Sequence, residues 1–148
     1  MTSNINAMGS NIINAASVPE LLRSIPQWIC WRAGKKKPNG KFDKYPVDPI
    51  TGNKHDAFDK SIWRSFEDAC RLAETKHLSG IGIVLTGEPV SHSEDGTPLY
   101  LIGLDIDEKS ELMLDGFTDV RKLWLRLGKP YLEISPSGNG YRMFALSS

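Results

Sequence analysis

The sequence contains little cysteine and histidine, and this scarcity argues against the common kinds of zinc site. Its only cysteines, Cys30 and Cys70, stand far apart in the chain, each inside an apolar pattern, and no CxxC spacing occurs. The three histidines, at positions 55, 77 and 92, are scattered. Zinc sites need Cys and His ligands at short, regular spacings, so we expect no zinc here. Two reduced, buried thiols in a cytosolic protein are the simplest interpretation.

Long apolar runs are also missing. No stretch approaches the roughly 18 consecutive apolar residues of a membrane span, so no membrane association is expected. Residues 1–16 are polar and rich in asparagine, and they lack the apolar segment of a secretory signal. We predict that they form a disordered leader or a cloning remnant. The whole chain of 148 residues has the size of one domain, which we place at residues 17–148.

The chain has no net charge of either sign, since 18 basic residues balance 18 acidic ones. Nucleic-acid-binding proteins are usually basic, so this balance argues against a purely electrostatic grip on DNA. The charges are nevertheless segregated along the chain. The early basic cluster contains Arg32, Lys35, Lys36, Lys37, Lys41 and Lys44, and acidic residues dominate residues 88–119. A metal-dependent enzyme acting on phosphates would have such a pattern, but solvated loops of opposite sign are the alternative.

Hydrophobic periodicity and turn residues predict a mixed series of helices and strands. Helices are expected at residues 17–25, 59–73 and 117–127. Strands are expected at residues 27–33, 80–86, 98–106, 131–134 and 141–146, with an additional extended segment at 41–47. The strands at 80–86 and 98–106 are expected to pair as one hairpin, and the last two strands as another. This order predicts an α+β fold, with helices packed on a mostly antiparallel sheet.

The sharpest local motif is Gly-Leu-Asp-Ile-Asp at the end of an apolar strand. Side chains alternate on a strand, so Asp105 and Asp107 project from one face, while Leu104 and Ile106 anchor the other face in the core. Two adjacent carboxylates repel each other unless a cation lies between them, and their hard oxygens suit Mg²⁺ or Mn²⁺. The alternative is that these acids simply extend from the strand into solvent.

A second motif surrounds the turn Ser-Gly-Asn-Gly between the last two strands. Two glycines let backbone N–H groups approach a phosphate closely, and Ser137 adds a hydroxyl group. Arg142, just past the turn, has a planar guanidinium that can neutralise such a phosphate. The same residues also make an ordinary hairpin turn, since Asn-Gly is its favoured dipeptide.

The basic cluster is the third candidate site. Arg32 and Lys44 are candidate contacts to a DNA template or a triphosphate, with Trp31 and Tyr45 available for stacking. For Lys35, Lys36 and Lys37, an exposed lysine-rich loop is the preferred interpretation.

Six segments, in this order, carry a resemblance to a known family. They are Gln27–Arg32, Lys44–Gly52, Ile62–Ala69, Gly80–Thr86, the strand that ends in Asp105 and Asp107, and Glu133–Arg142. The series covers about residues 18–146. It resembles the N-terminal region of phage- and plasmid-type DNA primases in the archaeo-eukaryotic primase-polymerase superfamily, a region that often precedes a helicase domain.

The resemblance implies an RRM-like catalytic core with an N-terminal α/β extension. It also implies template-directed nucleotidyl transfer that depends on Mg²⁺ or Mn²⁺, with DNA and nucleoside triphosphates as partners, in the cytoplasm of a bacterial host. Asp105 and Asp107 would be the catalytic, metal-binding carboxylates. The nucleotide-binding residues would be Ser135, Ser137, Gly138, Asn139, Gly140 and Arg142.

Two departures from the family pattern bear on activity. Many relatives carry a histidine where this chain has Arg142, so the nucleotide contact is expected to differ in kind. The family's third motif adds an acidic residue on a later strand, and this chain ends at Ser148. We therefore expect a fragment or a natural remnant, with weak or absent polymerase activity on its own. The alternative is a catalytically inactive module that binds nucleic acid or nucleotide, and a metal-dependent nuclease is a third candidate.

Overall fold

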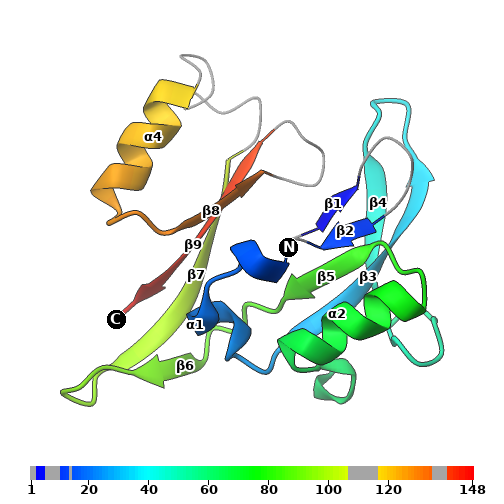
Figure 1. The fold of residues 1–148 in the computed structure, drawn as a ribbon, viewed down its shortest axis with the longest axis horizontal. Helices are drawn as coiled ribbons and strands as arrows, with labels where there is room; N and C mark the ends of the chain where they lie inside the picture. Colours follow the sequence, from blue (N-terminus) through cyan, green and yellow to red (C-terminus); the bar gives the residue numbers. More distant parts are fainter. Residues whose placement is uncertain (1–2, 6–10, 14, 107–116, 135–139) are drawn as a thin grey trace. The chain divides into compact units, whose positions relative to one another are not determined.

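The protein has an α+β fold with antiparallel sheets (Figure 1). The structure, a computed structural model, describes residues 3–5, 11–13, 15–106, 117–134 and 140–148. The chain divides into two compact units, Met1–Val84 and Leu85–Ser148. Among the described residues, the first unit holds a three-stranded sheet and the second a four-stranded sheet. An α+β fold with mostly antiparallel strands is therefore confirmed.

The first unit is built around the sheet β4-β3-β5, in which both pairings are antiparallel. Its strands are β3 (Trp28–Lys36), β4 (Phe42–Val47) and β5 (Gly80–Ile83). Its helices are η1 (Ala15–Ser17), α1 (Glu20–Arg23), η2 (Lys60–Ile62) and α2 (Phe66–Thr75). Within the stretch predicted as a leader, β1 (Ser3–Ile5) and β2 (Asn11–Ile13) form a separate antiparallel pair.

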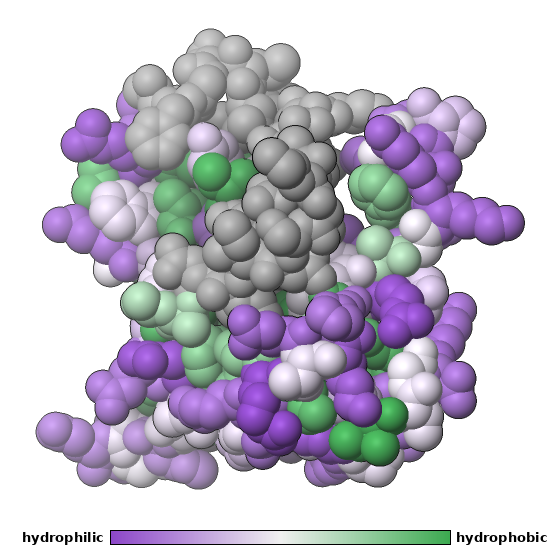
Figure 2. All heavy atoms as spheres, turned by 45° about the vertical axis from the view of Figure 1, so that its right-hand side comes forward, coloured by the Kyte–Doolittle hydropathy of each residue, from purple (hydrophilic) through white to green (hydrophobic). Residues whose placement is uncertain are grey.

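Hydrophilic residues cover most of the described surface on the face shown in Figure 2, and hydrophobic residues appear there as small patches. None of the helices in the described ranges is both long enough and apolar enough to cross a membrane.

Strand β3 is central because it is apolar on both faces. Its first four residues, Trp28 to Trp31, are all buried. On one face, the Trp28 ring makes an edge-on contact with Phe66 of α2, with 4.9 Å between ring centroids. On the other face, Ile29 forms a buried cluster with Ile62 and Val84. A strand covered on both sides needs a nearly continuous apolar run, and this segment supplies it.

The second helix begins later than the sequence predicts. The Asp59 carboxylate accepts the N–H of Ser61, but this cap starts only the short η2. The chain then becomes extended, because Arg64 exchanges two backbone hydrogen bonds with Trp28, of 2.8 and 3.1 Å. The hydroxyl of Ser65 caps α2 by accepting the N–H of Asp68. A strand pairing that is distant in the sequence therefore interrupts the expected helix.

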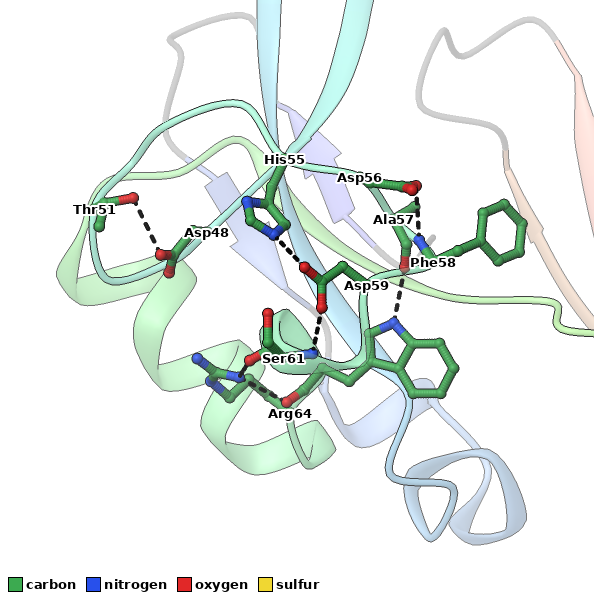
Figure 3. Close-up of polar contacts among 10 residues, drawn as sticks. Asp48, Thr51, His55, Asp56, Ala57, Phe58, Asp59, Ser61 and Arg64 are labelled. Atoms are coloured by element: carbon green, nitrogen blue, oxygen red, sulfur yellow. Dashed lines mark hydrogen bonds and ion pairs between the residues drawn. The ribbon is translucent and has the colours of Figure 1, made fainter.

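The loop between β4 and α2 is held by local polar contacts (Figure 3). His55 and Asp59 point toward each other, with 2.8 Å between Nε2 and Oδ2. The hydrogen bond to His55, followed by that from the Ser61 N–H, lowers the pKa of Asp59 to about 2. Asp48 accepts the N–H of Ile50 at the start of the loop, and this bond lowers the pKa of Asp48. These bonds span at most four residues, so they stabilise the loop itself.

The second unit contains the sheet β6-β7-β9-β8, in which all pairings are antiparallel. Its elements are β6 (Pro89–His92), β7 (Pro98–Ile106), α4 (Phe117–Arg126), β8 (Tyr131–Ile134) and β9 (Tyr141–Ser147). The predicted hairpin of β8 and β9 is confirmed. The predicted hairpin of residues 80–86 with 98–106 is wrong, because β5 pairs with β3 and β7 pairs with β6 and β9.

Helix α4 covers one face of this second sheet. Val120 of α4 packs with Ile106 and Met143 in a cluster whose three members are each at most 2% exposed. The indole N–H of Trp124 donates to the carbonyl of Pro130, 2.7 Å away, and ties the end of the helix to the start of β8. Ile106 is thus a core anchor, as predicted. Leu104 is 41% exposed, so its predicted burial is wrong.

Candidate functional site

The end of β7 lies beside the end of β8 and the start of β9. Ile106, the last residue of β7, is directly opposite Tyr141, the first residue of β9. Tyr141 is in turn opposite Ile134, the last residue of β8. The ends of β8 and β9 that flank residues 135–140 therefore lie beside the end of β7 that carries Asp105. Asp105 of the first motif and Arg142 of the second, which stand far apart in the sequence, are thus brought together at one end of one sheet.

Three charged residues form a row across the three strands at this end. Arg142 of β9 is directly opposite Asp105 of β7 on one side and Glu133 of β8 on the other. Directly paired residues share a face of a sheet. The neighbouring residues Ile106 and Met143 face α4, so the charged row lies on the opposite face.

The central arginine is held by one of its acidic neighbours. Arg142 Nε lies 3.3 Å from Asp105 Oδ1. The side chain of Arg142 is 19% exposed, whereas that of Asp105 is 67% exposed. The guanidinium is therefore largely shielded, and the carboxylate keeps most of its access to solvent. Such a carboxylate can accept a further ligand on its exposed side.

Glu133 is a member of this row that we did not predict as a site residue. Burial raises the pKa of its carboxyl, and the charge of Arg142 and the hydroxyl of Tyr131 oppose this rise. The Tyr131 hydroxyl donates to Glu133 Oε2 across 3.4 Å. A signal for Glu133 was present in the sequence. Once residues 131–134 and 141–146 are paired as a hairpin, Glu133 falls opposite Arg142.

An aromatic pair lies next to the charged row on the same face. Tyr131 is directly opposite Phe144, and their rings are 6.3 Å apart at an angle of 25°. Phe144 is in turn opposite Gly103, whose missing side chain leaves room for the ring. A β-carbon at position 103 would lie 3.4 Å from Phe144 Cε1 and 2.9 Å from Leu85 Cδ1. The site thus combines charge with an aromatic surface.

Several predicted site residues lie outside the part of the chain that the structure describes. These are Asp107, Ser135, Ser137, Gly138 and Asn139. Gly140 is described and is buried, directly before β9. Within the described residues, no group of three or more His, Cys, Asp or Glu side chains could hold a metal ion. Asp105 itself suits Mg²⁺ or Mn²⁺, because it is a hard, accessible oxygen donor, and Mg²⁺ often takes only one or two protein carboxylates.

The structure does not bring Arg32 and Lys44 onto one face. They lie on neighbouring strands, but Arg32 is opposite Tyr45, whereas Lys44 is opposite Ala33. Successive pairs face opposite sides, so Arg32 and Lys44 point apart. The expectation that Trp31 is available for stacking is wrong, because Trp31 is only 2% exposed and its indole N–H donates to the carbonyl of Ile81. Burial of its large ring in the core overrides a surface role.

No model of a known protein family matches the chain. No curated protein matches it either.

Proposed function

We propose that this chain is the catalytic region of a DNA primase-polymerase of the archaeo-eukaryotic type, performing metal-dependent, template-directed nucleotidyl transfer. The observation that supports this proposal best is the strand register. It places Asp105 directly opposite Arg142, near the ends of β8 and β9 that flank residues 135–140. A nucleotidyltransferase needs its metal-binding carboxylate within reach of the triphosphate, and residues 135–140 are the segment proposed to bind the triphosphate.

Each residue of the site has a proposed role. Asp105 and Asp107 would hold Mg²⁺ or Mn²⁺, which when bound lowers the barrier by neutralising charge on the phosphates. Ser137 and the backbone of residues 138–140 would receive the triphosphate. Arg142 would contact a phosphate oxygen from its position between two carboxylates. Its partly shielded guanidinium is already oriented by Asp105, which reduces the entropy lost on binding.

The aromatic pair would supply the remaining contact. Tyr131 and Phe144 lie two residues along their strands from the charged row, on the same face. A nucleotide whose phosphates meet Arg142 therefore has a nearby flat surface for its base or sugar. Stacking on aromatic rings tolerates every base, as a template-directed enzyme requires, because every base has a π face.

One contact favours the alternative of a binding module without catalysis. Asp105 is already paired with Arg142, so its charge is partly neutralised by the protein itself. In a module of that kind, the row of charges would bind nucleotide without needing a metal. The two functions therefore differ in whether nucleotide binding depends on the metal through Asp105.

Isothermal titration with a deoxynucleoside triphosphate, with and without Mn²⁺, separates the two functions. For the catalytic site, Mn²⁺ strengthens nucleotide binding in the wild type. Asp105→Asn should weaken the Mn²⁺-dependent binding of the nucleotide by at least roughly tenfold. Tenfold is the lower end of the loss seen when only the hydrogen-bond partner of a metal ligand is changed, so loss of the ligand itself should cost at least as much. Glu94→Gln, which neutralises an exposed acid in the same unit, is the matched control and should leave the gain intact. Equal binding by the wild type and Asp105→Asn would leave only the binding module.

A further inference from the structure

The β3–β4 hairpin concentrates the positive charge of a chain that is neutral overall. From Trp28 to Val47 it contains six basic residues and one acidic residue, Asp43. The basic residues are Arg32, Lys35, Lys36, Lys37, Lys41 and Lys44. The remainder of the chain therefore carries the compensating acidic excess, and this hairpin is the place where a polyanion would be attracted.

The tip of the hairpin is a defined turn. The N–H of Gly40 donates to the carbonyl of Lys37 across 2.9 Å, and the N–H of Lys37 donates to the carbonyl of Lys41 across 2.7 Å. Gly40 has a φ of 80°, a left-handed conformation that glycine adopts without strain. This is the pattern of a three-residue hairpin loop that ends in a glycine bulge. The lysines on both sides are thus presented on an ordered backbone.

An aromatic ring stands among these lysines. Phe42, the first residue of β4, is 46% exposed, although large apolar side chains are usually buried. The Nζ of Lys36 lies 5.9 Å from the centroid of the Phe42 ring. Lys37 is engaged differently, since its Nζ lies 2.6 Å from Asp43 Oδ1. Lys35, Lys36 and Lys41 belong to the same end of the hairpin and are exposed.

We propose that this hairpin is a binding surface for single-stranded nucleic acid, in which Lys36 and Lys41 contact the backbone phosphates and Phe42 stacks on a base. An exposed ring among cations matches the chemistry of a single strand, which offers both phosphates and free base faces. A duplex keeps its base faces stacked inside, so it would engage the lysines alone. The alternative is that these lysines are only the solvated surface of an exposed hairpin, and this alternative predicts no binding.

The inference goes beyond the proposed catalysis. The hairpin belongs to the first unit, whereas Asp105 and Arg142 belong to the second. Binding at the hairpin needs no metal, so it is measured in EDTA, where the proposed metal-dependent step is silent. Failure of either proposal is therefore visible independently of the other.

The test is fluorescence anisotropy of the whole chain with a labelled, mixed-sequence DNA single strand of about 20 nucleotides, which is long enough to span one binding site. Lys41→Ala is compared with Lys76→Ala, an exposed lysine at the end of α2 in the same unit. Lys41→Ala should reduce the slope of log affinity against log salt concentration by about 0.7. This is the change expected when one contact to a phosphate of a single strand is lost. Lys76→Ala should leave the slope unchanged. Phe42→Leu should weaken binding roughly 5- to 100-fold at every salt concentration, as loss of one stacked base predicts.

Four results would overturn the proposal. The first is no binding of the single strand at low salt by a wild-type chain that is folded by circular dichroism. The second is an equal effect of Lys41→Ala and Lys76→Ala, because the attraction would then not be localised. The third is equal affinity for the matching duplex combined with no effect of Phe42→Leu. Vesicles that contain anionic lipid serve as a competitor, and displacement of the DNA by them at equal charge would point to a membrane surface instead.

Discussion

Cys30 and Cys70 are close enough to influence each other, yet their environments differ. Cys30 is buried in β3, where its thiol lies 3.5 Å from the carbonyl of Ala69. Burial raises the pKa of Cys30 to about 12. Cys70, on α2, is only partly buried, and burial together with the charges of Glu67 and Glu74 raises its pKa to about 11. Both side chains are thus thiols at neutral pH, and neither suits a nucleophilic or metal-binding role.

We therefore expect the native protein to resist alkylation by iodoacetamide at pH 8. A thiol with a pKa near 12 is about one part in 10,000 thiolate at this pH, and only the thiolate reacts. Cys70 should react before Cys30, because its pKa is lower and its side chain is more accessible. Peptide mass spectrometry identifies the modified residue. The rate of alkylation of the protein unfolded in urea is the reference for an unprotected thiol. Modification of Cys30 first, or equal rates in native and unfolded protein, would contradict this prediction.

At the scale of elements, local signals and distant pairings compete. Asp59 and Ser65 are both good capping residues, and the apolar spacing runs through both. The pairing of Arg64 with Trp28 decides between them, because an extended residue cannot be part of a helix. By contrast, β7 spans Pro98–Ile106, as predicted, since its apolar run and the turn residues before it belong to the segment itself.

Ser65→Ala should lower the free energy of unfolding by about 1 kcal/mol, the usual cost of losing a helix cap. The Ser65 hydroxyl accepts the N–H of Asp68 across 3.2 Å, and alanine leaves that donor without this partner. Ser65→Asp keeps an acceptor and adds a charge that is favourable at the helix N-terminus, so it is the matched control. Urea unfolding followed by circular dichroism at 222 nm measures both. Equal midpoints for the two variants would show that the cap contributes nothing.

At the scale of the whole molecule, the two units have separate cores. In the first, Trp28, Ile81 and Leu78 are at most 1% exposed. In the second, Ile106, Met143 and Val120 form the cluster under α4. Packing is short-ranged, so removal of a side chain from one core acts first on the elements that touch it.

Met143→Ala should cost about 2–5 kcal/mol, because it removes most of a fully buried side chain and leaves a cavity. Hydrogen exchange measured by mass spectrometry should then rise mainly in β7, β8, β9 and α4. Ile81→Ala, a deletion of similar kind in β5, is the reciprocal control and should raise exchange mainly in residues 15–84. An equal rise across both units for either variant would contradict the separation of the cores.

The sequence by itself determined the features that arise within a few residues. The extent of β7, the β8–β9 hairpin and the apolar stripe of α2 all follow from neighbouring side chains and the geometry of the backbone. The sequence also determined which residues are chemically able to form a site, among them Asp105 and Arg142. Local spacing carries this information because side-chain direction repeats along a helix or strand.

Only the tertiary structure decided which of these features meet. It placed β5 against β3, put Trp31 in the core and turned Arg32 and Lys44 to opposite faces. It also set Arg142 between Asp105 and Glu133. Such pairings join residues that are far apart in the chain, and their choice depends on which arrangement buries the most apolar surface for all strands at once. No short segment of the sequence contains the information needed to choose among these arrangements.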